Sequence, residues 1–265
     1  MVEGSNSHLP HGIDLSGRVA LITGSSRGIG RATAIRLAEA GASVIVNYIT
    51  SQSAADEVAG QISQLGVRVA AVKADISEPD DITSMFEFIG NEFGQLDILV
   101  SNAASGGFRS LMEASPTHFA STMNTNVRSL MLLAQAARPL MLGERARRKI
   151  VALSSHGSHR ALPAYGLIGA SKAALESLVR HLATELGNDG INVNTLLAGL
   201  VETDSTSALP GSDQAFDVVR SRRVVGNLEL SPRAVADAIL FLCSPLSDLV
   251  QGQTLVVDGG ETLHG

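Results

Sequence analysis

Short apolar runs alternate with longer amphipathic stretches along almost the whole chain. Seven runs are rich in β-branched residues and apolar at successive positions, which is typical of strands buried on both faces. We expect these strands over residues 18–23, 43–48, 67–73, 96–101, 149–154, 191–197 and 254–258.

The stretches between the runs have apolar residues at the three- and four-residue spacing of helices. We expect helices over residues 30–40, 52–65, 79–93, 116–142 and 164–187. Gly66 and Gly94 follow the second and third of them, where glycine commonly ends a helix. Residues 199–232 are different, because Gly, Ser, Thr, Asp and Pro interrupt any periodicity. That stretch is too long for an ordinary connection, so we expect a mobile substrate lid.

Strands that alternate with helices predict an α/β fold. We expect a doubly wound, parallel, seven-stranded sheet between two helical layers, with right-handed crossovers. The 265 residues suit a single domain. We place that domain at residues 15–265 and expect residues 1–14 to be a flexible tail.

Composition excludes several classes of function. The formal charge is −6, only 3% of residues are aromatic and Trp is absent, so a nucleic-acid-binding surface is not expected. No apolar run is long enough to span a membrane, and residues 1–14 lack the apolar stretch of a signal peptide, so we expect a cytoplasmic protein. Cys243 is the only cysteine, which excludes an internal disulfide, and its apolar neighbours predict burial.

A glycine-rich turn follows the first strand, with the sequence Thr23-Gly24-Ser25-Ser26-Arg27-Gly28-Ile29-Gly30. Small residues let the backbone approach a pyrophosphate, and the following helix N-terminus offers unpaired N–H groups and a positive dipole end. We therefore expect a Rossmann-type dinucleotide site that includes Gly24, Ser26, Arg27, Gly28, Ile29 and Gly30.

The end of the second strand distinguishes the two nicotinamide dinucleotides. A protein that binds the unphosphorylated form usually has an acidic residue there. This chain has Asn47, Tyr48 and Thr50 instead, which leaves room for a 2′-phosphate. Arg27 could pair with that phosphate. We therefore expect NADPH as cofactor, with these four residues at its adenosine end.

Tyr165 and Lys172 are the strongest candidates for catalysis. They are seven positions apart, close to two helical turns, so we expect them on one side of a helix. An ammonium near a phenol favours the phenolate and makes the hydroxyl a better donor. An offset of four would also align the two groups, but position 169 is Gly.

Together these motifs resemble the short-chain dehydrogenase/reductase superfamily, over nearly all of the chain from Leu15 to Gly260. The other matching pieces are Asp75-Ile76, Asn102-Ala103-Ala104, Asn126 and Ala198-Gly199-Leu200-Val201-Glu202-Thr203. The resemblance implies that Asp75 and Ile76 contact the adenine and that Thr203 binds the nicotinamide carboxamide. It implies that Asn102 supports the sheet edge beside the cofactor, and that Asn126 provides a water or backbone link near Lys172. By the same resemblance the cofactor site also includes Ala103, Ala104, Tyr165, Lys172, Gly199 and Val201.

Two departures from the commonest members point to one branch of the superfamily. The commonest members have three residues between Tyr and Lys and a serine thirteen positions before the Tyr, whereas this chain has six residues and Ala152. The segments 154–165, 172–176 and 102–107 resemble enoyl-acyl-carrier-protein reductases, and the last resembles their NADPH-dependent type III. Many of these enzymes have a second tyrosine ten positions before the first. That position is Ser155 here, either a second hydroxyl donor or a simple cap of the strand end.

The resemblance implies reduction of the C2–C3 double bond of an acyl thioester, carried by CoA or an acyl carrier protein, in fatty acid biosynthesis or a specialised pathway. Tyr165 would stabilise the enolate, and Lys172 would bind the nicotinamide ribose. A ketoreductase acting on a carbonyl is the main alternative, and a dinucleotide-binding regulator without turnover is another. By analogy we also expect a homotetramer.

Two groups of polar residues stay outside this scheme. His156 and His159 lack carboxylate or Cys partners at ligand spacing, so we expect no metal site. Arg220, Arg222 and Arg223 lie in the lid-like stretch, where they could meet an acidic carrier protein or a CoA phosphate.

Overall fold

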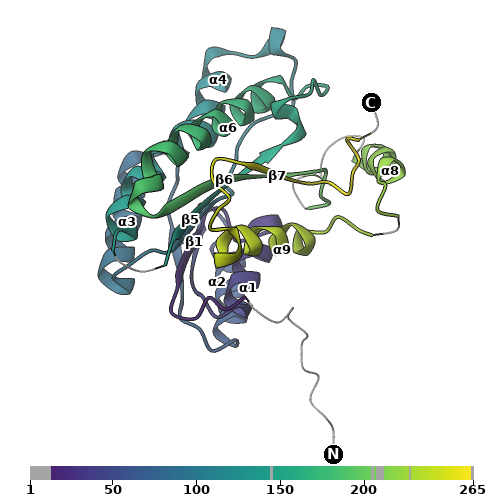
Figure 1. The fold of residues 1–265 in the computed structure, drawn as a ribbon. Coiled ribbons are helices and arrows are strands. Elements are labelled where there is room, and N and C mark those ends of the chain that lie inside the picture. The colour runs from purple at the N-terminus through teal and green to yellow at the C-terminus, as the bar shows by residue number, and fades with distance from the viewer. Residues whose placement is uncertain (1–12, 144–145, 204–205, 207–211, 227, 264–265) are drawn as a thin grey trace, which may run out of the picture.

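The computed structural model describes residues 13–143, 146–203, 206, 212–226 and 228–263. Its centre is one parallel sheet of seven strands in the order β3-β2-β1-β4-β5-β6-β7 (Figure 1). The strands are β1 (Val19–Ile22), β2 (Ser43–Tyr48), β3 (Val69–Lys73), β4 (Ile98–Ser101), β5 (Arg148–Ser155), β6 (Ile191–Ala198) and β7 (Thr254–Val257). The predicted doubly wound fold is confirmed, and every strand is found within two residues of its expected start and end.

Two hydrophobic cores fill the faces of the sheet, because successive strand residues point to opposite sides. In β1, Ala20 and Ile22 belong to one core, and Val19 and Leu21 to the other. The first core is covered by α1 (Gly28–Glu39), α2 (Gln52–Ser63) and α9 (Pro232–Cys243), and the second by α3 (Pro79–Phe93), α5 (Ser129–Met141) and α6 (Gly166–Leu186). Figure 1 shows these as two helical layers with the sheet between them.

The helix expected over 116–142 is found at residues 116–141, but its middle turn is π-helical. It consists of α4 (Pro116–Met123), a π-helical segment η2 (Asn124–Arg128) and α5, which contains Pro139. The buried Asn126 side chain makes hydrogen bonds outside this helix, and such widened turns are frequent at functional sites. A periodic apolar pattern does not reveal this insertion.

Two helices lie where no helix was expected. Helix α8 (Ser212–Arg222) lies within the stretch 199–232, of which residues 204–205, 207–211 and 227 are outside the described part of the chain. Helix α9 begins at Pro232 after Ser231, whose hydroxyl accepts a hydrogen bond from the N–H of Ala234. Cys243 at the end of α9 is buried, as its apolar neighbours predicted.

The ends of the domain also differ slightly from expectation. Residues 1–12 of the expected tail lie outside the described residues, but Ile13 already packs against the first core.

The remaining short elements are η1 (Leu111–Glu113), η3 (His156–Ser158), η4 (Gly187–Asp189) and η5 (Pro245–Ser247).

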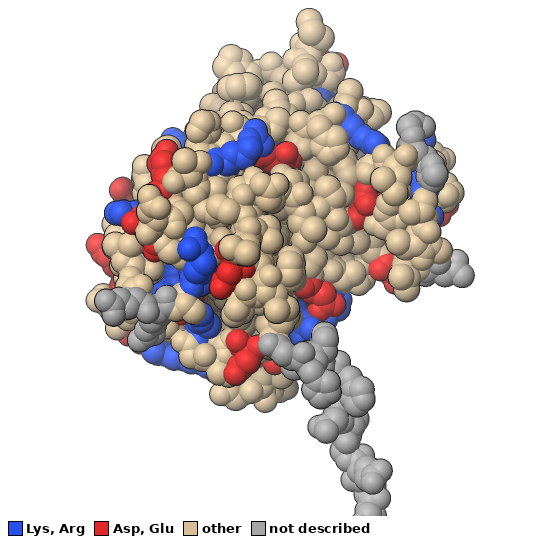
Figure 2. All heavy atoms as spheres, viewed as in Figure 1, with Lys and Arg blue, Asp and Glu red and all other residues tan. Residues whose placement is uncertain are grey.

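Surface charge and helix hydropathy agree with the composition. Figure 2 shows basic and acidic side chains interspersed on the visible face, without a large patch of one sign. Among the described residues, no helix combines the length and apolar character needed to cross a membrane.

Candidate active site

The glycine-rich turn lies at the carboxyl end of β1 and is packed tightly against the segment after β4. The Asn102 side-chain N–H group donates to the carbonyls of Thr23 (2.9 Å) and Gly24 (3.2 Å). A Cβ at Gly30 would come within 2.5 Å of the Gly24 carbonyl oxygen, and one at Gly24 within 2.9 Å of Ala103 Cβ. Close packing therefore requires glycine at positions 24 and 30, and Asn102 and Ala103 hold the turn in place by direct contact.

Asn47 and Tyr48 do not face the site as the sequence suggested. Asn47 is 2% exposed. Its carbonyl Oδ1 accepts a hydrogen bond from the Gly24 N–H (3.1 Å), and its Nδ2 donates to the Ala74 carbonyl (3.0 Å). Tyr48 is buried in the first core. Asn47 therefore shapes the turn, and of the residues expected around a 2′-phosphate only Arg27 and Thr50 are exposed.

A groove of about 720 Å³ runs beside the turn. Its lining includes Ser26, Arg27, Gly28 and Thr203, all expected cofactor residues. The two other arginines that line the groove already pair with carboxylates, Arg31 with Glu57 (3.2 Å) and Arg233 with Glu39 (2.7 Å). Within the described residues, Arg27 has no ion-pair partner, so its guanidinium is available to an anionic ligand.

The other residues expected at the cofactor are partly buried in the two cores. Ile76 is buried in the second core, so its side chain does not reach the groove, and the Asp75 carboxylate accepts hydrogen bonds from the N–H and hydroxyl of Ser77. Val201 is buried in the first core, and Gly199 lies against Asp258 and Leu230. Both side chains pack in the cores, and their contacts with a cofactor stay a prediction. Ile29 packs against the first core. Ala104 is exposed after β4.

Tyr165 lies at the start of α6, across from the end of β5. Its hydroxyl is 2.9 Å from Ser155 Oγ, so the structure brings these two predicted residues together. The preceding residue, Ala164, has φ of 57°, a conformation that a residue with a Cβ rarely adopts. The Ala164 carbonyl accepts the N–H of Arg109 (2.8 Å), and the ring of Phe108 lies 5.4 Å from the Tyr165 ring between centroids. These contacts fix the direction of the phenol.

Two glycines hold the Tyr165 ring from the other side. A Cβ at Gly157 would overlap ring carbons of Tyr165, and a Cβ at Gly169 would lie 2.5 Å from the Gly157 carbonyl oxygen. The turn η3 therefore fits between the ring and helix α6 only because both positions lack a side chain. This explains physically why position 169, one turn after Tyr165, is Gly.

Lys172 is buried and donates from Nζ to the Leu153 carbonyl of β5 (2.7 Å). Burial lowers the pKa of Lys172 to about 8, although Glu176 opposes the shift. No contact joins Lys172 to Tyr165 among the described residues, and burial raises the pKa of Tyr165 while the Ser155 hydrogen bond opposes that rise. The expectation that the ammonium favours the phenolate is therefore wrong for the protein by itself, because Tyr165 stays a protonated donor.

Asn126 connects the π-helical segment to the lysine helix. Its Oδ1 accepts the N–H of Ser105 (2.8 Å), and its Nδ2 donates to the Ser105 carbonyl and to Ser171 Oγ (2.9 Å each). Ser171 directly precedes Lys172. Asn126 thus fixes α6 beside Lys172 through direct contacts.

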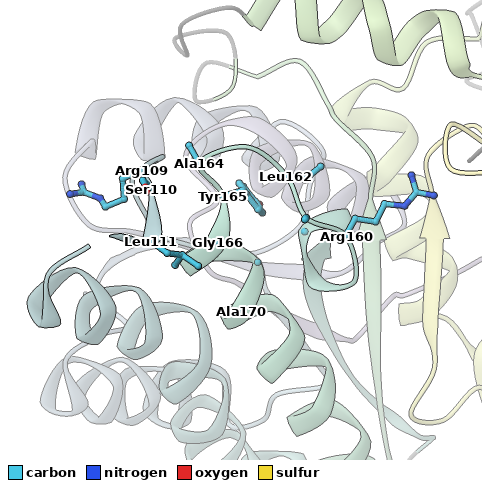
Figure 3. A pocket seen from close by; sticks show the side chains of 12 residues that line it. Arg109, Ser110, Leu111, Arg160, Leu162, Ala164, Tyr165, Gly166 and Ala170 are labelled. Carbon is cyan, nitrogen blue, oxygen red and sulfur yellow. The ribbon is translucent and has the colours of Figure 1, made fainter. Parts of the chain in front are cut away.

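A pocket of about 510 Å³ opens next to Tyr165. Figure 3 shows the phenol ring between Leu111 and Leu162, while Arg109 and Arg160 extend from the pocket in opposite directions. Leu111, Leu162 and Phe108 are large apolar side chains that remain more than 40% exposed. Sequence reasoning missed these residues, because no motif marks them and only their apolar character in a polar loop could have indicated a binding surface.

The expectation about histidines needs correction as well. His156 Nε2 lies 3.3 Å from Asp258 Oδ2 and 3.4 Å from Glu261 Oε1, although the sequence offered no carboxylate near it. Burial lowers the pKa of His156, and burial together with Asp258 raises the pKa of Glu261 to about 7. The fold brings these residues together from segments that are far apart in the chain.

Comparison with known proteins agrees with this geometry. A family model described as enoyl-(acyl carrier protein) reductase matches residues 24–262. The chain belongs to this family of short-chain dehydrogenases/reductases. It is an oxidoreductase, and the alternative of a regulator without turnover is set aside.

Individual relatives cover almost the whole chain. The 1-cyclohexenylcarbonyl-CoA reductase of Streptomyces collinus is 39% identical over 249 residues, which are 92% of this chain and 86% of the relative. Versicolorin reductase 1 of Dothistroma septosporum is 34% identical over 256 residues, 93% of this chain and 96% of the relative. The crystal structure of a short-chain dehydrogenase from Burkholderia cenocepacia J2315 in complex with NADP has a TM-score of 0.84 and 34% identity, and covers 93% of this chain and 98% of that one.

Proposed function

We propose that this protein uses NADPH to reduce the C2–C3 double bond of an apolar enoyl thioester. The observation that carries the proposal is the Tyr165 hydroxyl, 2.9 Å from Ser155 Oγ and beside a pocket that apolar side chains line in part. Hydride addition to the β-carbon leaves negative charge on the thioester oxygen until a proton from water reaches the α-carbon, so the site needs a hydrogen-bond donor at that oxygen. A tyrosine whose pKa is raised meets this need, because it donates without losing its proton.

The residues of the groove fit a phosphorylated dinucleotide. NADPH supplies the hydride when bound. Arg27, which has no ion-pair partner in the described part of the chain, offers its guanidinium to the 2′-phosphate, and the end of β2 has no carboxylate to repel it. Among the described residues Lys172 makes one hydrogen bond, to Leu153, and a lysine ammonium has three donors, which leaves two for ribose hydroxyls. The solved relative with NADP supports the same choice.

The substrate class follows from the pocket and from one relative. Leu111, Leu162, three alanines and three glycines line the pocket together with the polar Arg109, Ser110 and Arg160. The apolar part suits an alicyclic or short acyl group. The Streptomyces collinus relative acts on a cyclohexenyl-CoA thioester by its name, which supports CoA as carrier. Arg220 gives little support to an acyl carrier protein as the partner, because its guanidinium already pairs with Glu202 (2.9 Å).

A substrate panel tests the proposal. Crotonyl-CoA, 1-cyclohexenylcarbonyl-CoA and acetoacetyl-CoA are each assayed by NADPH absorbance, and again with NADH. We expect turnover of the enoyl thioesters with preference for NADPH, and a fall of at least about 10²-fold in kcat for Tyr165→Phe with cofactor affinity unchanged. Turnover of acetoacetyl-CoA alone would instead establish the ketoreductase alternative, which the versicolorin reductase relative favours.

The homotetramer and a role in fatty acid biosynthesis remain parts of the proposal. Exposed apolar side chains on α4 and α5 (Phe119, Met131) and near β7 (Leu246, Leu249, Val256) offer two faces for self-association. Light scattering after size exclusion should give four times the chain mass of 27.5 kDa.

A further inference from the structure

Three ionisable side chains are buried together where the turn η3 meets the segment that follows β7. His156 comes from η3, next to Ser155, while Asp258 and Glu261 follow β7. Their side chains are 9%, 7% and 9% exposed. This cluster is not part of the groove or of the pocket beside Tyr165.

The polar atoms of this cluster are close but poorly satisfied. One ligand atom from each of the three residues lies within 4.8 Å of the others. The approaches of His156 Nε2 to the two carboxylates lack hydrogen-bond geometry, and both His156 nitrogens and Glu261 Oε2 have no hydrogen-bond partner in the described chain. Each such buried atom costs about 1–3 kcal/mol, so a ligand that bonded to these atoms would be stabilising.

The surroundings orient Asp258, and the charges of nearby arginines only partly offset the burial and the Asp258 charge that raise the pKa of Glu261. Asp258 Oδ1 accepts the N–H of Gly260 (2.8 Å), and Oδ2 accepts the hydroxyl of Thr262 (2.7 Å). The nearest arginines make other bonds: Arg160 donates to the Thr262 carbonyl (2.8 Å) and Arg223 to the Leu200 carbonyl (3.2 Å). Asp258 is therefore oriented toward the imidazole by its neighbours, as metal-ligating carboxylates are.

We propose that His156, Asp258 and Glu261 bind one divalent transition-metal ion, Zn²⁺ or Mn²⁺. One imidazole nitrogen and two carboxylate oxygens form a donor set that suits these ions. Bonds of about 2.0–2.2 Å place two ligand atoms roughly 3.4 Å apart around a tetrahedral ion. His156 Nε2 already lies 3.3 and 3.4 Å from the two carboxylates. Only the carboxylates, whose ligand atoms lie within 4.8 Å, would have to approach each other, by at most about 1.4 Å. The ion has no part in the hydride transfer; it fastens the turn that carries Ser155 and Gly157 to the C-terminal segment.

The test uses the full chain after dialysis against EDTA, with ZnCl₂ and MnCl₂ titrated separately in a calorimeter. His156→Gln and Glu261→Gln remove ligands, and His159→Gln is the matched control, because its exposed ring makes an edge contact of 5.5 Å with His156 and has no carboxylate partner among the described residues. We expect the wild type and His159→Gln to bind one equivalent of at least one metal, and the other two variants to bind at least about 100-fold more weakly. The wild type should also unfold about 5 °C higher at a hundredfold excess over Kd.

Binding that is unchanged in His156→Gln, or lost in His159→Gln, would overturn the proposal, as would no stoichiometric binding by the wild type. Where a variant fails to fold, as seen by circular dichroism, anomalous scattering from a crystal of the wild type soaked in ZnCl₂ decides. Density between His156 and Glu261 supports the site, and its absence at full metal occupancy elsewhere refutes it.

Discussion

Gly169 gives the sharpest test of how Tyr165 is positioned. An alanine Cβ at this position would lie 2.5 Å from the Gly157 carbonyl oxygen, whereas ordinary contacts begin at 3.4 Å. The turn η3 would have to move by about 0.9 Å, the difference between 3.4 and 2.5 Å. Because Gly157 also lies against the Tyr165 ring, the phenol would move with the turn.

The expected effect of Gly169→Ala follows from these distances. A misplacement of about 1 Å at a reacting group costs about 10²-fold in rate, so kcat/KM should fall by about that factor. Alanine gains about 1 kcal/mol over glycine in a helix, and overpacking costs about 1–3 kcal/mol. The free energy of unfolding should therefore stay level or fall by up to about 2 kcal/mol.

Gly60→Ala is the matched control, because Gly60 lies in helix α2 and an alanine Cβ there would have no heavy atom of another part of the protein within 4 Å. It should raise the free energy of unfolding by about 1 kcal/mol and leave turnover unchanged. Urea unfolding and NADPH oxidation with crotonyl-CoA measure the two quantities. The reasoning is refuted if Gly169→Ala is stabilised as Gly60→Ala is and keeps more than half of its activity.

Three further substitutions test other parts of the site. Lys172→Met should abolish turnover yet raise the free energy of unfolding by up to about 3 kcal/mol below pH 8, because burial lowers the Lys172 pKa from 10.5 to about 8 in the folded protein. This gain in stability should fade as the pH rises towards 10.5, and urea unfolding at pH 7 and pH 10 measures it. Arg27→Ala should raise the KM for NADPH at least about 10-fold and leave that for NADH unchanged, and equal changes for both cofactors would disprove a 2′-phosphate contact. Ala164→Gly should stabilise the protein by up to about 1 kcal/mol by relieving the φ of 57°, and thermal unfolding that shows a loss would contradict strain at this residue.

The features predictable from sequence are those that depend on neighbours in the chain. The strands, the glycine turn and the Tyr165–Lys172 pair have local patterns, and the fold follows from their order. The π-helical segment depends on bonds of Asn126 to Ser105 and Ser171, which no periodicity shows. Helix α9 begins where the irregular stretch 199–232 ends, and it was missed although Ser231-Pro232 is a common helix start.

Tertiary packing also decided which polar residues face the groove. The position of Asn47 at the end of the second strand predicted a place beside the cofactor, yet its side-chain amide makes hydrogen bonds to the backbone of Gly24 and Ala74. The pairing of His156 with Asp258 and Glu261 depends on the sheet order that brings the ends of β5 and β7 to the two sides of β6. Spacing in the chain carries no information about either arrangement.

The position of Lys172 follows from the space that the Gly157 carbonyl occupies beside α6. The buried ammonium of Lys172 should make cofactor binding depend on pH. The Gly157 carbonyl leaves no room for a side chain at position 169, so an ammonium must come from elsewhere on α6, and Lys172 reaches the Leu153 carbonyl from within the core. Its pKa of about 8 reflects burial with only one acceptor described for it. Ribose hydroxyls that accept from the remaining N–H groups would raise that pKa, so binding should take up protons near pH 8 to 9. The NADPH Kd measured by calorimetry should therefore increase as pH rises through about 8 in the wild type and stay flat in Lys172→Met, and a wild-type Kd that is constant from pH 7 to 9.5 would show that this lysine does not hold the cofactor as an ammonium.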